Sequence, residues 1–170
     1  MGSVQTPPDE IATAGEVMQA YVPADWPVEQ ALSRVADVPR WTFYPPDLSE
    51  PAARERVART IARAGLAVRY VIRTAQGPVG MVGISGLDGS TPDVFYALLP
   101  GGRGRGVATR AVVALADWAL DHGAEEVHVT TLVGNDASEA VARRAGFAVT
   151  EERLDERDGA PIRIWSRLRA

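Results

Sequence analysis

The chain is organised around residues 100–109, which read Pro100-Gly101-Gly102-Arg103-Gly104-Arg105-Gly106-Val107-Ala108-Thr109. They follow an apolar, strand-like run at residues 94–99 and precede a helical pattern that extends to residue 122. Backbone N–H groups at a helix N-terminus are unpaired and bind phosphate well, and glycine lets the backbone approach a ligand closely. The sequence therefore predicts a strand, a turn and a helix, with an anion site at the turn.

Two common nucleotide motifs are excluded in this segment. A Walker A loop requires a lysine after its last glycine, and the chain contains no lysine. The G-x-G-x-x-G fingerprint fails at its third glycine, where Val107 stands when counting from Gly102 and Thr109 when counting from Gly104. A flexible surface loop rich in glycine and arginine is the alternative interpretation.

Two spaced motifs carry a resemblance to a known family. Residues 103–108 fit R-x-x-G-x-A, and residues 135–147, Asn135-Asp136-Ala137-Ser138-Glu139-Ala140-Val141-Ala142-Arg143-Arg144-Ala145-Gly146-Phe147, fit N-x-x-S-x-x-V-x-x-x-x-G-F. The pair resembles the GNAT superfamily of N-acetyltransferases, in the branch that acetylates ribosomal-protein N-termini and small amines. The resemblance implies an α/β (α+β) fold with a mixed, mostly antiparallel sheet of six to seven strands flanked by helices.

Composition indicates one ordinary globular domain. The chain has 170 residues, of which 46% are hydrophobic and 24% charged, and we expect residues 9–170 to form a single domain and residues 1–8 to be disordered. No apolar run approaches the roughly 20 residues that cross a bilayer, and no secretion signal is apparent, so we expect a cytoplasmic protein with no membrane partner. All 18 basic residues are arginine, which we interpret as a GC-rich, bacterial coding bias.

Metal and nucleic-acid functions are disfavoured. The chain has no cysteine and two histidines, so we expect no metal site. The net charge of −4 argues against nucleic acid and is compatible with a cationic small substrate. Monomer and homodimer both remain open.

Periodicity and turn residues predict the elements in order. We expect an ill-defined strand between residues 11 and 22, a helix from residue 27 that Pro39 ends, and an extended segment over residues 41–46. Ser49 should cap a second helix that Gly65 stops. Strands are expected at 67–74, 79–87 and 127–133. A helix is expected at 107–122, and a short helix should begin at Asp136 with Glu139 and end at Gly146. Residues 147–151 and 161–168 should form an antiparallel pair.

The resemblance assigns the grip on acetyl-CoA, the expected co-substrate. The amides from 103 to 109 should take the pyrophosphate, with Arg103 and Arg105 adding charge, and the backbone of Leu98 and Leu99 should pair with the pantetheine arm. Asn135 should hydrogen-bond the same arm, or simply begin its helix. These predicted coenzyme residues are Leu98, Leu99, Arg103, Gly104, Arg105, Gly106, Val107, Ala108, Thr109, Asn135 and Ser138.

Acetyl transfer also requires a base for the amine and a proton for the thiolate. Asp93 starts the strand where relatives often carry a glutamate and is the candidate base, although it could equally be a turn residue after Pro92. Ser138, which matches the motif serine, and Tyr96 are the candidate acids. Ala142 stands where many relatives place a tyrosine, and Phe95 stands where a glycine is usual, which changes the shape of the acetyl pocket.

The acceptor pocket should lie near the first two helices. Trp41, Phe43 and Tyr44 are the candidate substrate residues, with core packing as the alternative. The acidic run at 151–156 could attract a cationic amine or be a solvated loop. We expect an acetyl-CoA-dependent N-acetyltransferase that acts on the primary amine of a small molecule, an antibiotic or metabolite, by direct attack in a ternary complex. The alternatives are a protein N-terminal acetyltransferase and a non-catalytic acyl-CoA-binding module.

Overall fold

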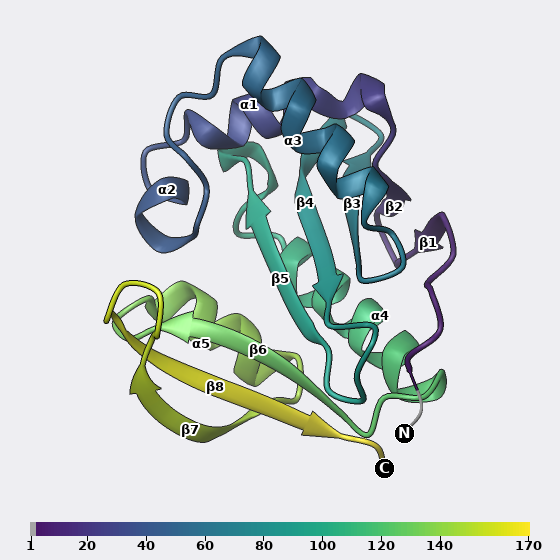
Figure 1. Ribbon diagram of the computed structural model, residues 1–170, viewed down its shortest axis with the longest axis vertical. Helices are drawn as coiled ribbons and strands as arrows, with labels where there is room; N and C mark the ends of the chain where they lie inside the picture. The colour runs from purple at the N-terminus through teal and green to yellow at the C-terminus, as the bar shows by residue number, and fades with distance from the viewer. Residues whose placement is uncertain (1–2) are drawn as a thin grey trace.

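A computed structural model describes residues 3–170 as a sheet with helices on both faces (Figure 1). The elements in chain order are β1 (Glu10–Ala12), β2 (Val17–Ala20), η1 (Pro23–Asp25), α1 (Trp26–Ser33), α2 (Val38–Trp41), α3 (Glu50–Ala62), β3 (Ala67–Thr74), β4 (Gly77–Ser85), β5 (Asp93–Leu98), η2 (Pro100–Gly102), α4 (Val107–Asp121), β6 (Glu126–Leu132), α5 (Asp136–Arg144), β7 (Ala148–Leu154) and β8 (Pro161–Leu168).

The sheet is mixed, mostly antiparallel, and opens near its middle. Its strand order is β1-β2-β3-β4-β5-β6-β8-β7, and every neighbouring pair is antiparallel except β5 with β6. These two parallel strands pair only at Asp93 and His128. Figure 1 shows them close together at one end and well apart at the other. The divergence leaves inward-facing backbone groups of both strands without a strand partner.

Two separate cores hold the helices on the sheet. One joins the sheet to α4 and α5 through residues such as Val94, Leu115 and Trp165, and the other joins it to α1, α2 and α3 through residues such as Leu32 and Val57. Successive residues of a strand face opposite sides. The side chains of β5 therefore divide between the two cores.

Local sequence explains where the principal helices begin. The Ser49 hydroxyl accepts a hydrogen bond from the Ala52 amide at 3.3 Å, as expected for an N-cap. Gly106 precedes α4 with φ of 74°, a left-handed conformation that glycine adopts readily. The buried side of α4 is rich in alanine, which lets this helix lie close against the sheet.

Several sequence predictions require correction. The sheet has eight strands because residues 10–20 form the hairpin β1–β2 instead of one ill-defined strand. Pro39 does not end the first helix; it lies in the first turn of α2, where a missing N–H is harmless, and Trp41 is helical. The N-cap of α5 is Asn135 instead of Asp136.

The N-terminal segment also differs from the expected disorder. Residues 1 and 2 lie outside the described residues, but Val4 is buried and its amide donates to the Leu87 carbonyl at 3.0 Å. The Tyr70 hydroxyl donates to the Pro8 carbonyl at 2.8 Å. The prolines and small residues of this segment are typical of a disordered terminus. Here, however, the tertiary contacts hold the segment against the sheet.

Candidate active site

The opening between β5 and β6 presents free backbone groups. The Leu99 amide donates to Val79 on the β4 side, whereas the Pro92 carbonyl accepts from His128 on the β6 side. Because backbone groups alternate along a strand, the amides of Tyr96 and Leu98 point into the opening. A ligand with an amide-containing chain can therefore continue the sheet there.

Leu98 and Leu99 differ in their availability for that chain. The Leu98 carbonyl accepts a hydrogen bond from Arg103 at 3.1 Å, so its amide is the group left facing the opening. Leu99 donates to Val79 and accepts from Gly102, both at 2.9 Å. Both of its backbone groups are used inside the protein, so the amide of Leu98 is the more available group for the predicted pairing.

The glycine-rich turn forms a cradle at the start of α4. Gly102 lies so close to β4 that an added Cβ would meet the Val79 carbonyl oxygen at 2.7 Å, whereas nothing lies within 4 Å of one on Gly104. The first hydrogen bond of α4 is donated by Arg110 to Gly106. The amides of residues 107–109 therefore precede the helical ladder. Among the described residues the buried Thr109 hydroxyl has no partner. This donor set fits a pyrophosphate group.

The two arginines of the turn have separate roles. Arg103 makes two hydrogen bonds of 2.7 Å to the Asp37 carboxylate, and this guanidinium holds the pKa of Asp37 below its usual value. This ion pair joins the turn to Asp37, the residue before α2. The Arg105 side chain is exposed and bonds the Gly101 carbonyl. The pairing of Arg103 with Asp37 was not predicted from the sequence.

Tyr96, Ser138 and Asn135 meet on the α4 side of the opening. The Ser138 hydroxyl oxygen accepts from the Tyr96 hydroxyl at 3.2 Å and from the Asn135 side-chain amide at 2.9 Å. The Asn135 oxygen in turn accepts from the Ser138 amide at 3.3 Å, so Asn135 caps α5. Burial raises the pKa of the Tyr96 hydroxyl, which stays protonated. The sequence named all three residues, and the structure brings them together.

Asp93 lies on the opposite face of β5. Burial raises the pKa of its carboxyl, and His128, Thr130 and Arg157 lower it in part. A raised pKa makes a carboxylate a stronger base at neutral pH. His128, Thr130 and Arg157 were not predicted, because their nearness to Asp93 depends on strand pairing and on the β7–β8 turn.

Phe95 keeps the opening clear despite replacing the usual glycine. A Cβ added to Gly83 would lie 2.5 Å from the Phe95 ring, so the ring lies across the bare backbone of Gly83 on β4. The aromatic side chain is directed away from β6. The missing side chain on one strand therefore accommodates the extra side chain on the next.

The predicted aromatic cluster divides into three environments. Tyr44 is buried and donates to the Glu29 carboxylate at 2.8 Å, so it belongs to the core and not to an open pocket. Phe43 is 56% exposed and carries the Arg157 guanidinium 3.6 Å from its ring centroid. Trp41 is half-buried with Arg40 over its ring. The sequence placed these residues correctly near the first helices but did not distinguish core from surface.

The acidic run at 151–156 is largely paired within the protein. Asp155 is buried and bonded to Arg157, and this guanidinium lowers the pKa of the Asp155 carboxyl to about 2. Glu151 and Glu152 form ion pairs with Arg153 and Arg163. The run therefore offers little free negative charge to an amine.

Residues 3–170 contain no cluster of three or more metal-ligating side chains of the histidine, cysteine or carboxylate type. None of their helices has the length and apolar character needed to span a membrane.

Comparison with known proteins identifies the family. The family model described as acetyltransferase (GNAT) domain matches residues 10–148, which is most of the chain. The chain belongs to the GNAT acetyltransferase family. The predicted fold class and enzyme class are thereby confirmed. Comparison with curated proteins gives no match.

Solved structures share the fold at low sequence identity. RimL, a ribosomal L7/L12 alpha-N-protein acetyltransferase in complex with coenzyme A, is 20% identical with a TM-score of 0.84, covering 94% of this chain and 97% of RimL. Spermidine N-acetyltransferase from Vibrio cholerae, with CoA and spermine, is 15% identical with a TM-score of 0.80, covering 92% and 96%. The microcin C7 self-immunity acetyltransferase MccE, with acetyl-CoA and AMP, is 16% identical with a TM-score of 0.81, covering 96% and 98%. Two of these proteins are named for different acceptors, the ribosomal protein L7/L12 for one and spermidine for the other.

Proposed function

We propose that this GNAT enzyme transfers the acetyl group of acetyl-CoA to the primary amine of a small molecule, by direct attack in a ternary complex. One observation carries the proposal: Asp93 lies on one face of β5, where the opening between β5 and β6 begins, and a bonded pair of hydroxyls lies on the other face. Attack by an amine and departure of a thiolate need a base and an acid in separate places. The two faces of β5 provide them.

Asp93 accepts the proton of the attacking amine. An amine with a pKa of about 10.4 is neutral in only about one molecule in 2500 at pH 7, so its deprotonation strongly limits the rate. Burial makes Asp93 a better base than an exposed aspartate by raising its pKa. The nitrogen forms a bond to the acetyl carbon, and its proton passes to Asp93 directly or through one water molecule.

Ser138 supplies the proton to the departing sulfur. Acetyl-CoA contributes a thioester, whose thiolate is a moderate leaving group because its parent thiol has a pKa of about 8.5. The Ser138 oxygen already accepts from Tyr96 and Asn135, so its own proton is free to be donated elsewhere. As the C–S bond breaks, that proton moves to sulfur, while Tyr96 stays protonated and stabilises the Ser138 oxygen through its hydrogen bond. Solvent then returns a proton to Ser138 as Asp93 releases the one taken from the amine.

The entrance favours a small acceptor. Arg157, from the turn between β7 and β8, lies over Phe43, which follows α2, and this contact joins the two segments on the Asp93 side of the sheet. This contact leaves less room on the Asp93 side of the sheet for a folded protein to approach. The similarity to RimL nevertheless makes a protein N-terminus the second candidate acceptor.

A thiol-release assay tests the proposal. Purified protein with acetyl-CoA should release free thiol with at least one small primary amine, and Asp93→Asn should bind CoA normally but release thiol far more slowly. A panel of peptides with free N-termini tests the second candidate. If CoA binds and no acceptor gives release, the protein is a binding module and the catalytic roles are wrong.

A further inference from the structure

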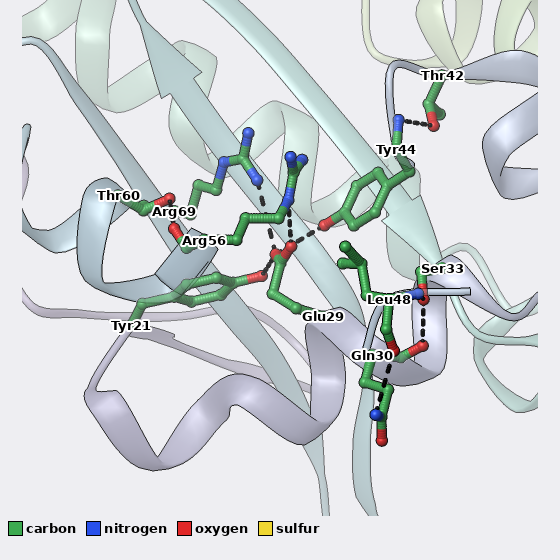
Figure 2. A network of polar contacts seen from close by, with 10 residues as sticks. All are labelled: Tyr21, Glu29, Gln30, Ser33, Thr42, Tyr44, Leu48, Arg56, Thr60 and Arg69. Atoms are coloured by element: carbon green, nitrogen blue, oxygen red, sulfur yellow. Dashed lines mark hydrogen bonds and ion pairs between the residues drawn. The ribbon is translucent and has the colours of Figure 1, made fainter. Parts of the chain in front are cut away.

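Glu29 is the fully buried centre of a polar cluster on the acceptor side of the sheet (Figure 2). Its carboxylate accepts from the hydroxyls of Tyr21 and Tyr44 at 2.5 and 2.8 Å and from Arg56 at 2.6 Å. Arg69 lies beside it, with Nη1 3.6 Å from Oε1 of Glu29. These residues come from α1, α3, β3 and two loops. The cluster therefore connects the segments on the acceptor side of the sheet.

The cluster has more positive than negative charge. One carboxylate faces two guanidinium groups, and guanidinium remains charged at all physiological pH values. Burial raises the pKa of the Tyr21 and Tyr44 hydroxyls, so neither tyrosine contributes negative charge. Glu29 neutralises one arginine, and the other positive charge has no acidic partner within the cluster. The cluster therefore keeps a net positive charge, which favours the binding of an anion beside it.

The outer edges of the two guanidinium groups are directed away from Glu29. Figure 2 shows nitrogens of Arg56 and Arg69 pointing to the same side of the cluster. The two side chains are 18% and 22% exposed, so a ligand can reach them. The buried Nη1 atom of Arg69 is the one that faces Glu29, so a ligand meets the other nitrogens of this guanidinium. Adjacent donors with fixed positions match the oxygens of a carboxylate or phosphate.

This positive edge lies near the proposed base. The Arg69 guanidinium is 5.3 Å from the centroid of the Phe95 ring, and Phe95 follows Asp93 by two residues on the same face of β5. Two residues of a strand span about 7 Å. An acceptor of several atoms can therefore place its amine at Asp93 and an anionic group at Arg69, with Phe95 beneath it.

We propose that Arg56 and Arg69 form an anion subsite, so that the acceptor is an amine that also carries a carboxylate or phosphate. The proposal rests on the acetyltransferase function proposed above and narrows its substrate class. It also predicts that polyamines, whose distal group is cationic, are poor acceptors here. Glu29 and the two tyrosines act as positioning residues, since they hold the arginines without contacting the acceptor.

Matched acceptors test the subsite in the wild-type enzyme. Amines of three to six carbons are compared in sets that differ only in the distal group: an ω-amino acid, its uncharged amide and the diamine, with an aminoalkyl phosphate as the phosphate arm. Charge-assisted hydrogen bonds typically change affinity by about 10- to 100-fold. We expect kcat/KM for the best anionic acceptor to exceed that of its amide by about this factor, mainly through KM, with the diamine slower still.

Arg69→Gln is the variant that isolates the contribution of the subsite. It should bring the ratio of anionic to amide kcat/KM close to one, whereas Arg59→Gln, an exposed arginine of α3, should leave the ratio as in the wild type. If Arg69→Gln does not fold, the wild type still decides: butyrate or inorganic phosphate should inhibit competitively with the amine, and butanamide should not. The ion that inhibits identifies the anionic group.

Three results would overturn the subsite. These are equal rates for the amide and the anionic acceptor, a preference for the diamine, or an anionic preference that survives in Arg69→Gln. Absence of thiol release with every amine would instead reject the proposed function. In that case calorimetry with butyrate and butanamide, on the wild type and Arg69→Gln, tests the subsite separately.

Discussion

Replacing Glu29 with glutamine should strongly destabilise the fold. The substitution keeps the size of the side chain but removes the charge that faces Arg56 and Arg69. The glutamine amide would also direct an N–H group toward the N–H of Arg56, or toward the hydroxyl donors if it turned. No rotation satisfies all three donors, because Glu29 is completely buried and water cannot take its place.

The size of the loss follows from the three hydrogen bonds. Removing one partner of a buried ion pair costs about 3–5 kcal/mol. Each buried donor left without an acceptor accounts for about 1–3 kcal/mol of this cost. Domains of ordinary stability unfold with about 5–15 kcal/mol, so Glu29→Gln should remove about a fifth or more of the total. For a chain of this length the melting temperature should fall by about 6 to 20 °C.

Urea denaturation followed by circular dichroism measures this loss. Glu50→Gln is the matched control, because Glu50 forms a 2.8 Å ion pair with Arg54 but is about half exposed. Its loss should stay below about 1 kcal/mol. A loss for Glu29→Gln below about 1 kcal/mol, or equal to that of the control, would show that the buried cluster does not hold the acceptor side together.

Three further predictions concern the catalytic opening. Asp93→Asn should slow thiol release by about 10²- to 10⁴-fold. Because burial raises the folded-state pKa of Asp93, the ionised form opposes folding above that pKa. The Asn variant should therefore be more stable than the wild type at pH 8, with the difference shrinking toward pH 4, as denaturation at each pH will show; a difference that grows on acidification contradicts the raised pKa. Ser138→Ala should lower kcat by about 10- to 100-fold and Tyr96→Phe by less, since Ser138 donates directly; the reverse order in steady-state assays would assign the acid role to Tyr96. Gly102→Ala should weaken CoA binding in calorimetry by about tenfold, because its Cβ would displace the turn from the Val79 carbonyl, whereas Gly101→Ala, with nothing within 4 Å, should bind normally; equal affinities would show that the turn does not form the cradle.

The elements that were predicted well have signals within a few residues of each other. Ser49 caps its helix through the Ala52 amide three positions on, and the alternation of residues 67–74 gives β3 with the same bounds. The hairpin β1–β2 was missed because its strands of three and four residues are too short for a clear period. The helical turn at Trp41 was missed because the prolines that follow it were taken to indicate an extended segment. A proline disfavours helix only for the residue directly before it, and Trp41 does not precede one.

The residues of the candidate site also divide into those with a local sequence signal and those whose partners lie far along the chain. Asn135 and Ser138 are three residues apart, and the glycine turn is continuous, so motif spacing located both. Glu29 reads as an ordinary solvated helix residue, and its partner Arg56 lies 27 positions away. Nothing near Asp37 indicates that it neutralises Arg103, which is 66 positions along the chain.

Sequence alone was sufficient for the family, the strand-turn-helix unit and the residues around the opening, because backbone conformation and motif spacing depend on neighbouring residues. The folded chain was needed to show which charges are paired, which aromatic rings are buried and which backbone groups are free. Those properties depend on the register of strands and the packing of helices across the sheet. For this protein they place Asp93 on one face of β5 and the bonded hydroxyls of Tyr96 and Ser138 on the other, and they leave one positive charge in the cluster around Glu29.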